Sequence, residues 1–450
     1  MMFSGFKTLS AGLYVYVLQT ALIFSCITVA QGASENAPGL QAGAASPTTA
    51  QTGPSAPATD KTAEQTRTTE TIPQYDLKII IPSLSRAIVN IEGTVHAVND
   101  HSAFAILPGQ EYKFDIEGQP ISVQNEKELK VDSSTIFHFS GTTKIRQNAK
   151  CQANGAEFYC LNKVYPNPEL LAAQGRYKCL FSTPHKFKAL TADSSVIQSN
   201  GLQFQIAHFT KHFTLLANKM QVTFMMPGGF IPDMYYCRFM TKTLKNYQEK
   251  FGPLPFKLLH VGAIQRGGDN EVNGSPSGNL ILVSRTALGA PLNPKTATPP
   301  GAKQDISESL RKMVLAHELA HMWFGETYLG ADGWMVEGIP QYLGIVEAVR
   351  SVEPEEAESL LAFLAKAAEM APPGAIPNHQ LDSPQEFARA YYASALAMYE
   401  IGKGIGHDHL VDLLVAVYKK NKSPTFADFD AAFRSQFPKQ VELWQKSWRL

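Results

Sequence analysis

The sequence predicts an α+β multidomain protein in which an antiparallel β-rich domain precedes a mainly helical domain. Its 450 residues exceed the usual size of a single domain. From Ile72 to about Phe224 the chain consists of short β-branched and aromatic runs separated by Gly, Asn and Pro, which is typical of strands. After Pro232 the apolar residues recur at helical spacing. We therefore expect the β-rich domain at residues 73–228 and the helical domain at 229–450.

The strand predictions of the first domain follow from the same β-branched and aromatic runs. They cover residues 77–81, 87–98, 112–116, 134–141, 177–183, 202–209 and 213–217. In the second domain we expect a helix at 233–250, which Gly252 and Pro253 would end. Apolar runs then predict strands near 257–264 and 279–285, and further helices follow to the C-terminus.

The charge balance excludes one class of partner. Forty Lys and Arg residues offset forty Asp and Glu residues, so the formal net charge is zero. Proteins that bind nucleic acid need a clustered cationic surface to neutralise phosphates. We expect a peptide or small molecule as the partner, and no nucleic acid.

The N-terminal region is predicted to direct export. Residues 9–30 contain no charged side chain and are long enough to span a bilayer, while small residues follow at 30–33. Residues 1–33 are therefore either a cleaved signal peptide or a membrane anchor. Residues 34–72 are rich in Ala, Thr, Pro, Gln and Ser, a composition typical of a disordered linker. Both alternatives place the folded part in the periplasm, outside the cell, or on an outward-facing anchor.

Four cysteines beyond this region suggest disulfide bonds, as in exported proteins. Cys151 and Cys160 flank the turn signal at 154–155, so we expect these two to pair. Cys179 and Cys237 would then form the second bond. A zinc site is the alternative, but the close Cys-x-x-Cys spacing that such sites use is missing.

One helix of the second domain carries a metal motif. Asp305 and Glu308 form a D-x-x-E capping box, which predicts a helix that runs to about residue 324. His317 and His321 are four residues apart, so both imidazoles project from one face of this helix. The string HELAH is H-E-x-x-H, in which two histidines bind zinc and the intervening Glu318 acts as general base.

A third ligand is expected at Glu337, in the segment GWMVEGIPQYLG. This segment is predicted to form a second helix that folds back on the first. Two imidazoles and one carboxylate leave a zinc position open for water, which is the arrangement of catalytic sites.

These segments resemble a known family. HELAHMWFG (317–325) and WMVEGIPQYL (334–343) are similar to the zinc-binding segments of aminopeptidase N-type zinc metallopeptidases, which are gluzincins. Residues 426–448 resemble the end of their catalytic domain. The resemblance implies a thermolysin-like catalytic domain with one Zn²⁺ held by His317, His321 and Glu337. It also implies Glu318 as base and a peptide substrate.

The resemblance also implies an oxyanion-stabilising tyrosine. In the family this tyrosine opens a helix, and AYYASALAMYEIGKGIG (390–406) is similar. The best register places Tyr392 there, with Tyr391 as its direct competitor. A phenol near a metal can donate a hydrogen bond to developing negative charge.

The chain departs from the family pattern at two functional positions. First, the family's Glu that binds the substrate amine has no clear counterpart, because its position falls near Ser275 or Pro276. We assign substrate binding to Glu271, with Asp269 as an alternative. Second, an acid seven residues past the zinc-binding Glu often orients a ligand, and this chain has Gly344 there. Glu347 lies one turn further on.

The sequence favours an exported, aminopeptidase-like zinc metallopeptidase that uses a zinc-activated water and Glu318. Because the amine anchor is unclear, an endopeptidase or another amide hydrolase is an alternative. A catalytically inactive, zinc-containing peptide-binding protein is a third possibility.

Overall fold

The computed structural model describes the folded part of the chain. The described residues are 74–86, 88–96, 102–105, 110–116, 119–124, 128–131, 136–144, 151–161, 167–168, 175–198, 202–265, 273–290, 307–324, 333–374, 376, 383–421 and 424–449. The predicted signal or anchor (1–33), the linker (34–72) and Glu271 lie outside these residues. Within them, no helix combines the length and apolar character needed to cross a membrane.

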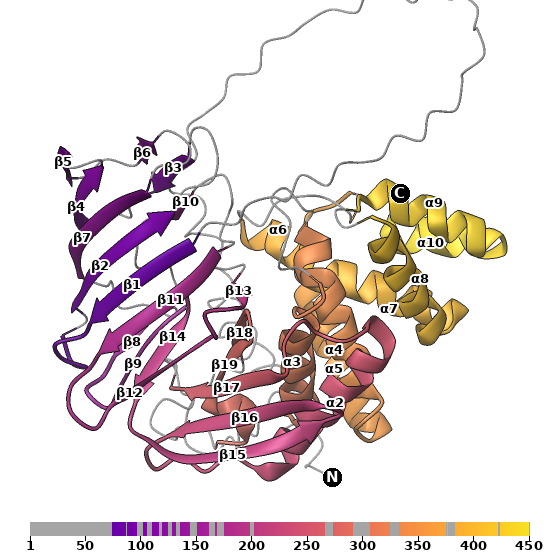
Figure 1. The fold of residues 1–450 in the computed structure, drawn as a ribbon. Helices are drawn as coiled ribbons and strands as arrows, with labels where there is room; N and C mark the ends of the chain where they lie inside the picture. Colours follow the sequence, from indigo (N-terminus) through magenta and orange to yellow (C-terminus); the bar gives the residue numbers. More distant parts are fainter. Residues whose placement is uncertain are drawn as a thin grey trace, which may run out of the picture.

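The largest sheet of the N-terminal half has seven strands, in the order β13-β11-β1-β2-β7-β4-β5 (Figure 1). Its strands are β1 (Gln74–Ile80), β2 (Ile88–His96), β4 (Gln110–Ile116), β5 (Gln119–Gln124), β7 (Ile136–Lys144), β11 (Gly175–Ser182) and β13 (Ile197–Gln198). Alternate residues of β1 are buried, so one face of this strand packs on a core. The sheet is not wholly antiparallel as expected, because β1 and β11 run parallel.

Two smaller sheets complete this β-rich part. One has the order β12-β14-β9-β8 and the other β10-β3-β6. Their strands are β12 (Lys188–Thr191), β14 (Phe204–Ala207), β9 (Glu157–Cys160), β8 (Cys151–Ala153), β10 (Asn167–Pro168), β3 (Ser102–Ala105) and β6 (Glu128–Val131).

The hairpin predicted between the first two cysteines is confirmed. Gly155 turns the chain with φ of 84°, and the Asn154 side chain accepts the amide of Glu157 at 2.8 Å. The register sets Cys151 opposite Cys160, which is disulfide-bonded. The partner of Cys160 stays our prediction.

The second predicted disulfide is wrong. Cys179 and Cys237 are both free. Cys179 packs against the core of the β-rich part, whereas Cys237 is fully buried in the core of the helical part. The two thiols therefore belong to separate hydrophobic clusters, which elimination among cysteines could not reveal.

A five-stranded mixed sheet, in the order β15-β16-β17-β19-β18, begins the second part of the molecule. Its strands are β15 (Phe209–Ala217), β16 (Met220–Pro227), β17 (Leu258–Ile264), β18 (Gly274–Ser277) and β19 (Leu280–Ser284). We expected β15 and β16 in the β-rich domain, but β16 pairs in parallel with β17. Helix α2 (Met234–Phe251) connects these two strands, as parallel pairing requires.

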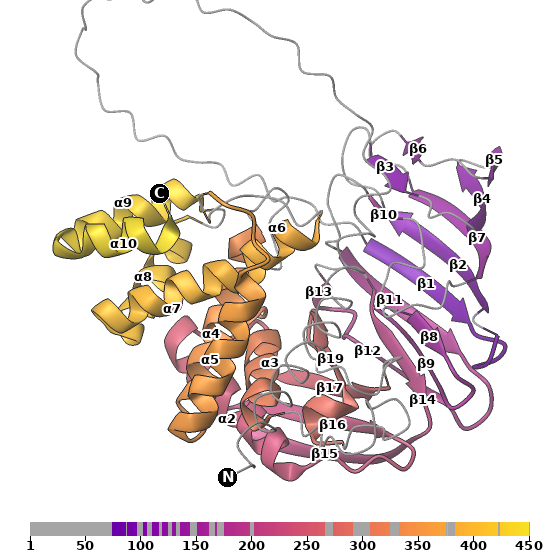
Figure 2. The same cartoon turned by 180° about the vertical axis from the view of Figure 1, so that it is seen from behind.

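Most of the described residues after β19 are helical, and these helices lie on the side of the five-stranded sheet away from the large β-sheet (Figure 2). They are α3 (Glu308–Ala320), α4 (Ile339–Val349), α5 (Pro354–Ala368), α6 (Pro384–Ala388), α7 (Ser394–Ile405), α8 (His407–Lys420), α9 (Phe426–Gln436) and α10 (Val441–Trp448). Short helical turns accompany them: η1 (Arg285–Leu288), η2 (Trp334–Gly338), η3 (Arg389–Ala393) and η4 (Pro438–Gln440).

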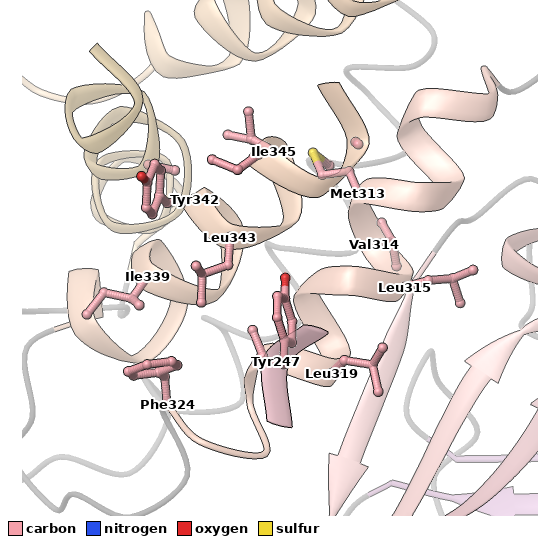
Figure 3. Close-up of a cluster of buried hydrophobic side chains, with 14 of the residues drawn as sticks. Tyr247, Met313, Val314, Leu315, Leu319, Phe324, Ile339, Tyr342, Leu343 and Ile345 are labelled. Carbon is pink, nitrogen blue, oxygen red and sulfur yellow. The ribbon is translucent and has the colours of Figure 1, made fainter. Parts of the chain in front are cut away.

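Helices α3 and α4 pack against each other at the centre of this part. Leu315 and Leu319 of α3, and Leu343 and Ile345 of α4, are at most 3% exposed and belong to one apolar cluster (Figure 3). This packing sets α3, which carries His317, beside the segment in which η2, with Glu337, continues into α4.

Buried polar contacts join the β-rich part to the five-stranded sheet. Glu157 of β9 is 1% exposed and accepts Arg285 Nη2 at 2.6 Å and the Gln265 amide at 2.7 Å. Asn279 donates to Asp193 at 2.7 Å. A buried carboxylate is tolerated only when it is paired and hydrogen-bonded, so these contacts fix how the two parts dock.

Candidate active site

The two histidines of the motif lie at the end of helix α3, which is itself buried. Its N-cap is Ser307, whose hydroxyl accepts the Leu310 amide at 3.2 Å. The predicted capping residue, Asp305, lies outside the described part of the chain. Every residue of α3 after Glu308 is buried, and His317 and His321 are 2% and 8% exposed. The histidines therefore face protein rather than bulk water.

The three predicted metal ligands converge on one point. His317 Nε2 lies 3.5 Å and His321 Nε2 lies 3.7 Å from Glu337 Oε2. The two imidazole nitrogens are 2.9 Å apart. All three ligand atoms lie within 4.8 Å of one another, so a single ion could contact them together.

Two π-helical turns bring distant segments to this point. Glu337 lies in η2, and the tyrosine pair of the 390–406 segment lies in η3. The turns touch at Gly338, where a Cβ atom would come within 2.7 Å of the Ala390 carbonyl oxygen. Single π-helical turns are frequent at functional sites because they re-aim side chains within a helix.

Burial sets the charge of the imidazoles. It lowers the pKa of His317 to about 3 and that of His321, with the neighbouring His317, to about 4. Burial raises the pKa of Glu337, and His321 opposes that shift. The histidines are therefore neutral at pH 7, which is the form that binds a metal. Two neutral nitrogens and one carboxylate oxygen are a donor set that fits Zn²⁺.

Glu318 lies beside the ligands and next to the edge of the five-stranded sheet. It is 6% exposed. A Cβ atom on Gly274 of β18 would come within 2.5 Å of Glu318 Cγ and 2.8 Å of Glu318 Cδ. The missing side chain at residue 274 thus makes the space that the Glu318 carboxyl group occupies, a contact that sequence reasoning did not find.

The tyrosine nearest the histidines is Tyr391. Its hydroxyl lies 3.5 Å from His317 Nε2, and the two rings are 5.1 Å apart between centroids. Tyr392, which we predicted, is 3% exposed, belongs to the apolar core and packs edge-on against Tyr391 and Phe387. Of the two candidates for the oxyanion-stabilising tyrosine, Tyr391 is therefore the one that lies next to a metal ligand.

The position expected for the amine anchor is held by β18. Ser275 Oγ accepts a hydrogen bond from Gln203 Nε2 at 2.7 Å. Glu271, our predicted substrate-binding residue, and Asp269 lie outside the described residues. Their role stays a prediction.

Gly344 and Glu347 occupy different environments on α4. Gly344 packs against α3, since a Cβ there would come within 2.6 Å of the Met313 carbonyl oxygen. The Glu347 side chain lies near Arg350 and near residues of α2, including Asn246 and Lys250. Burial raises the pKa of Glu347. Glu347 therefore faces away from the ligands and does not replace the missing acid.

The sequence matches no protein-family model, and no curated protein matches it. Solved structures do match at the level of fold. An M1 zinc metallopeptidase from Deinococcus radiodurans superposes with a TM-score of 0.59 at 14% identity, over 84% of this chain and 93% of that one. The chain has the fold of the M1 zinc metallopeptidases.

Two related structures contain ligands. A two-domain M1 zinc metallopeptidase variant bound to L-arginine has a TM-score of 0.57 at 15% identity, over 84% of this chain and 93% of that one. A Deinococcus radiodurans variant bound to a Tyr-Ser-Ala substrate has a TM-score of 0.56 at 13% identity, with the same coverage of both chains. The two-part architecture, β-rich and then helical, agrees with these neighbours.

Proposed function

We propose that this protein is a zinc-dependent metallopeptidase that hydrolyses peptide bonds. The observation that carries the proposal is the convergence of His317, His321 and Glu337, whose ligand atoms lie within 4.8 Å of one another on two packed helical segments. Glu318, adjacent in sequence to the first ligand, supplies a base beside them. The neighbouring structures are zinc metallopeptidases, and one of them is bound to a peptide.

Each residue of the site has a chemical task in this mechanism. A zinc ion bound here would polarise the scissile carbonyl and acidify water. Glu318 takes the proton of the attacking water and passes it to the leaving amine. Tyr391 donates a hydrogen bond to the oxygen on which negative charge develops. The edge strand β18 offers backbone groups that can pair with an extended peptide.

The decisive experiment is metal content together with peptide hydrolysis by the purified protein, alongside His321→Ala. We expect about one zinc per chain and hydrolysis in the wild type, because three ligands are in place. The variant is expected to lose both, since one imidazole cannot be replaced by the methyl group of alanine. A wild-type protein that binds no zinc, or hydrolysis that survives removal of the metal by a chelator, would refute the proposal.

We further propose aminopeptidase-like specificity, for which the bound amino acid in one neighbouring structure gives support. Endopeptidase activity is the second candidate, because Ser275 and Pro276 hold the position where the family's amine-gripping Glu would fall. Free and N-acetylated versions of one peptide separate the two. Faster hydrolysis of the free peptide is expected for an aminopeptidase, and equal rates would instead favour an endopeptidase.

Removing the Tyr391 hydroxyl tests its assignment. Tyr391→Phe is expected to lower kcat about 10²–10³-fold, the usual effect of losing one oxyanion donor. Tyr392→Phe is the matched control and should stay within a few-fold of the wild type, because its ring packs in the core. Steady-state kinetics of both variants give the comparison. The reverse order of effects would return the role to Tyr392.

A further inference from the structure

One ring nitrogen of His317, Nδ1, lacks a hydrogen-bond partner of good geometry. His317 Nε2 faces Glu337, whereas Nδ1 is buried and unpaired. His321 differs, because its Nδ1 lies 3.3 Å from the Phe324 carbonyl oxygen. A histidine that binds a metal through one nitrogen almost always donates its other N–H to an acceptor, which fixes the tautomer and the ring orientation.

Gln341 supplies a buried polar side chain beside His317. It lies on α4, one turn beyond Glu337, and is completely buried. Its side chain interacts with His317 and opposes the lowering of the His317 pKa by burial. Gln341 Oε1 is itself buried without a partner. Two interacting side chains thus each have a buried polar atom without a partner: Oε1 of Gln341, an acceptor, and Nδ1 of His317, which can donate.

Met313 orients the amide of Gln341. Gln341 Nε2 donates to Met313 Sδ at 3.4 Å. A thioether can only accept, so it binds the NH₂ end of the amide. The carbonyl end, Oε1, is then left to face His317.

Gly344 explains why the acceptor comes from residue 341. A Cβ atom at 344 would lie 2.6 Å from the Met313 carbonyl oxygen and 3.2 Å from His317 Cβ. The two helices are too close there for any side chain. Residues 341 and 344 lie on the same face of α4, because they are three positions apart. The nearest position with room for an acceptor is therefore one turn earlier.

We propose that Gln341 is a positioning residue for His317, whose Nδ1–H it accepts through Oε1 so that Nε2 is held toward the metal. This inference rests on the proposed zinc site. The Gln341 amide has the role that a carboxylate has in many metal sites, where it accepts the second N–H of a metal-binding histidine. A neutral acceptor supports the imidazole without adding a negative charge to the buried centre.

The test is the zinc dissociation constant of the full chain, measured by competition with a chelator. We compare the wild type with Gln341→Met, which keeps the length of the side chain but removes the acceptor, and with Gln341→Glu, which restores an acceptor. Gln341→Met is expected to bind zinc about 10–100-fold more weakly. Gln341→Glu is expected to bind at least as tightly as the wild type. The melting temperature of the metal-free proteins and the His317 Nδ1–H signal in NMR spectra are the additional readouts.

The outcomes separate this inference from the proposed function. Weaker zinc binding and loss of the slowly exchanging Nδ1–H signal in Gln341→Met, with an unchanged melting temperature and rescue by Gln341→Glu, would support it. Equal zinc affinity in all three proteins, or equal losses in both variants, would overturn it while leaving the zinc site intact. A wild-type protein that binds no zinc would overturn both.

Discussion

Glu318→Gln is expected to lose peptide hydrolysis while it keeps zinc. The glutamine has the same shape, so it fits the space beside Gly274, but it cannot take a proton from water. General acid–base catalysis raises the rate about 10²–10⁴-fold, so we expect kcat to fall by about 10²-fold or more. The three metal ligands are unchanged, so zinc content is expected to stay at the wild-type level. Metal analysis and steady-state hydrolysis of the same preparation measure both.

The matched control for this variant is Glu347→Gln. Glu347 is a partly buried acid on α4, and its carboxylate faces Arg350 and helix α2. Its replacement should leave hydrolysis within a few-fold of the wild type. If Glu318→Gln retained a tenth or more of the activity, another group would have to be the base. If it lost zinc as well, Glu318 would act in the fold of the site.

Residues on one helix could be placed from the sequence because local geometry fixes them. The four-residue spacing of His317 and His321 requires one helical face, and the structure has that face. Glu337 was predicted to meet them from a second helix, and it does. The tyrosine that lies nearest His317 is Tyr391, one position before the predicted Tyr392. It lies in a π-helical turn, which shifts the direction of the side chains, and the sequence carries no mark of such a turn.

Other features that depend on packing between distant segments were not predicted. Strands β15 and β16 have the composition of the β-rich part, but they pair with each other and β16 also pairs with β17, which follows helix α2. Cys179 and Cys237 were joined by elimination, yet they lie in different cores. Gly274 and Gln341 carry no motif, because their importance arises from what the fold places against them.

Gly274→Ala is expected to impair catalysis without unfolding the protein. The added Cβ would meet Glu318 Cγ at 2.5 Å and Cδ at 2.8 Å, closer than real Cβ contacts allow. These atoms belong to a flexible side chain, so the carboxyl group can move aside at a small cost in stability. A displacement of about 1 Å at a catalytic group can lower the rate about 10²-fold. We therefore expect kcat to fall by about that factor while zinc content and melting temperature stay near the wild-type values.

Gly228→Ala provides the control for the change of glycine to alanine. A Cβ at Gly228 would lie 3.4 Å from the His208 carbonyl oxygen, and this turn lies away from the ligands, between β16 and α2. It should keep full activity. Full activity of Gly274→Ala would show that the Glu318 carboxyl group can move without loss of function, which would contradict its role as a fixed base. A variant with low activity, low zinc and a lowered melting temperature would place Gly274 in the fold instead, so all three readouts are needed to assign the loss to the position of Glu318.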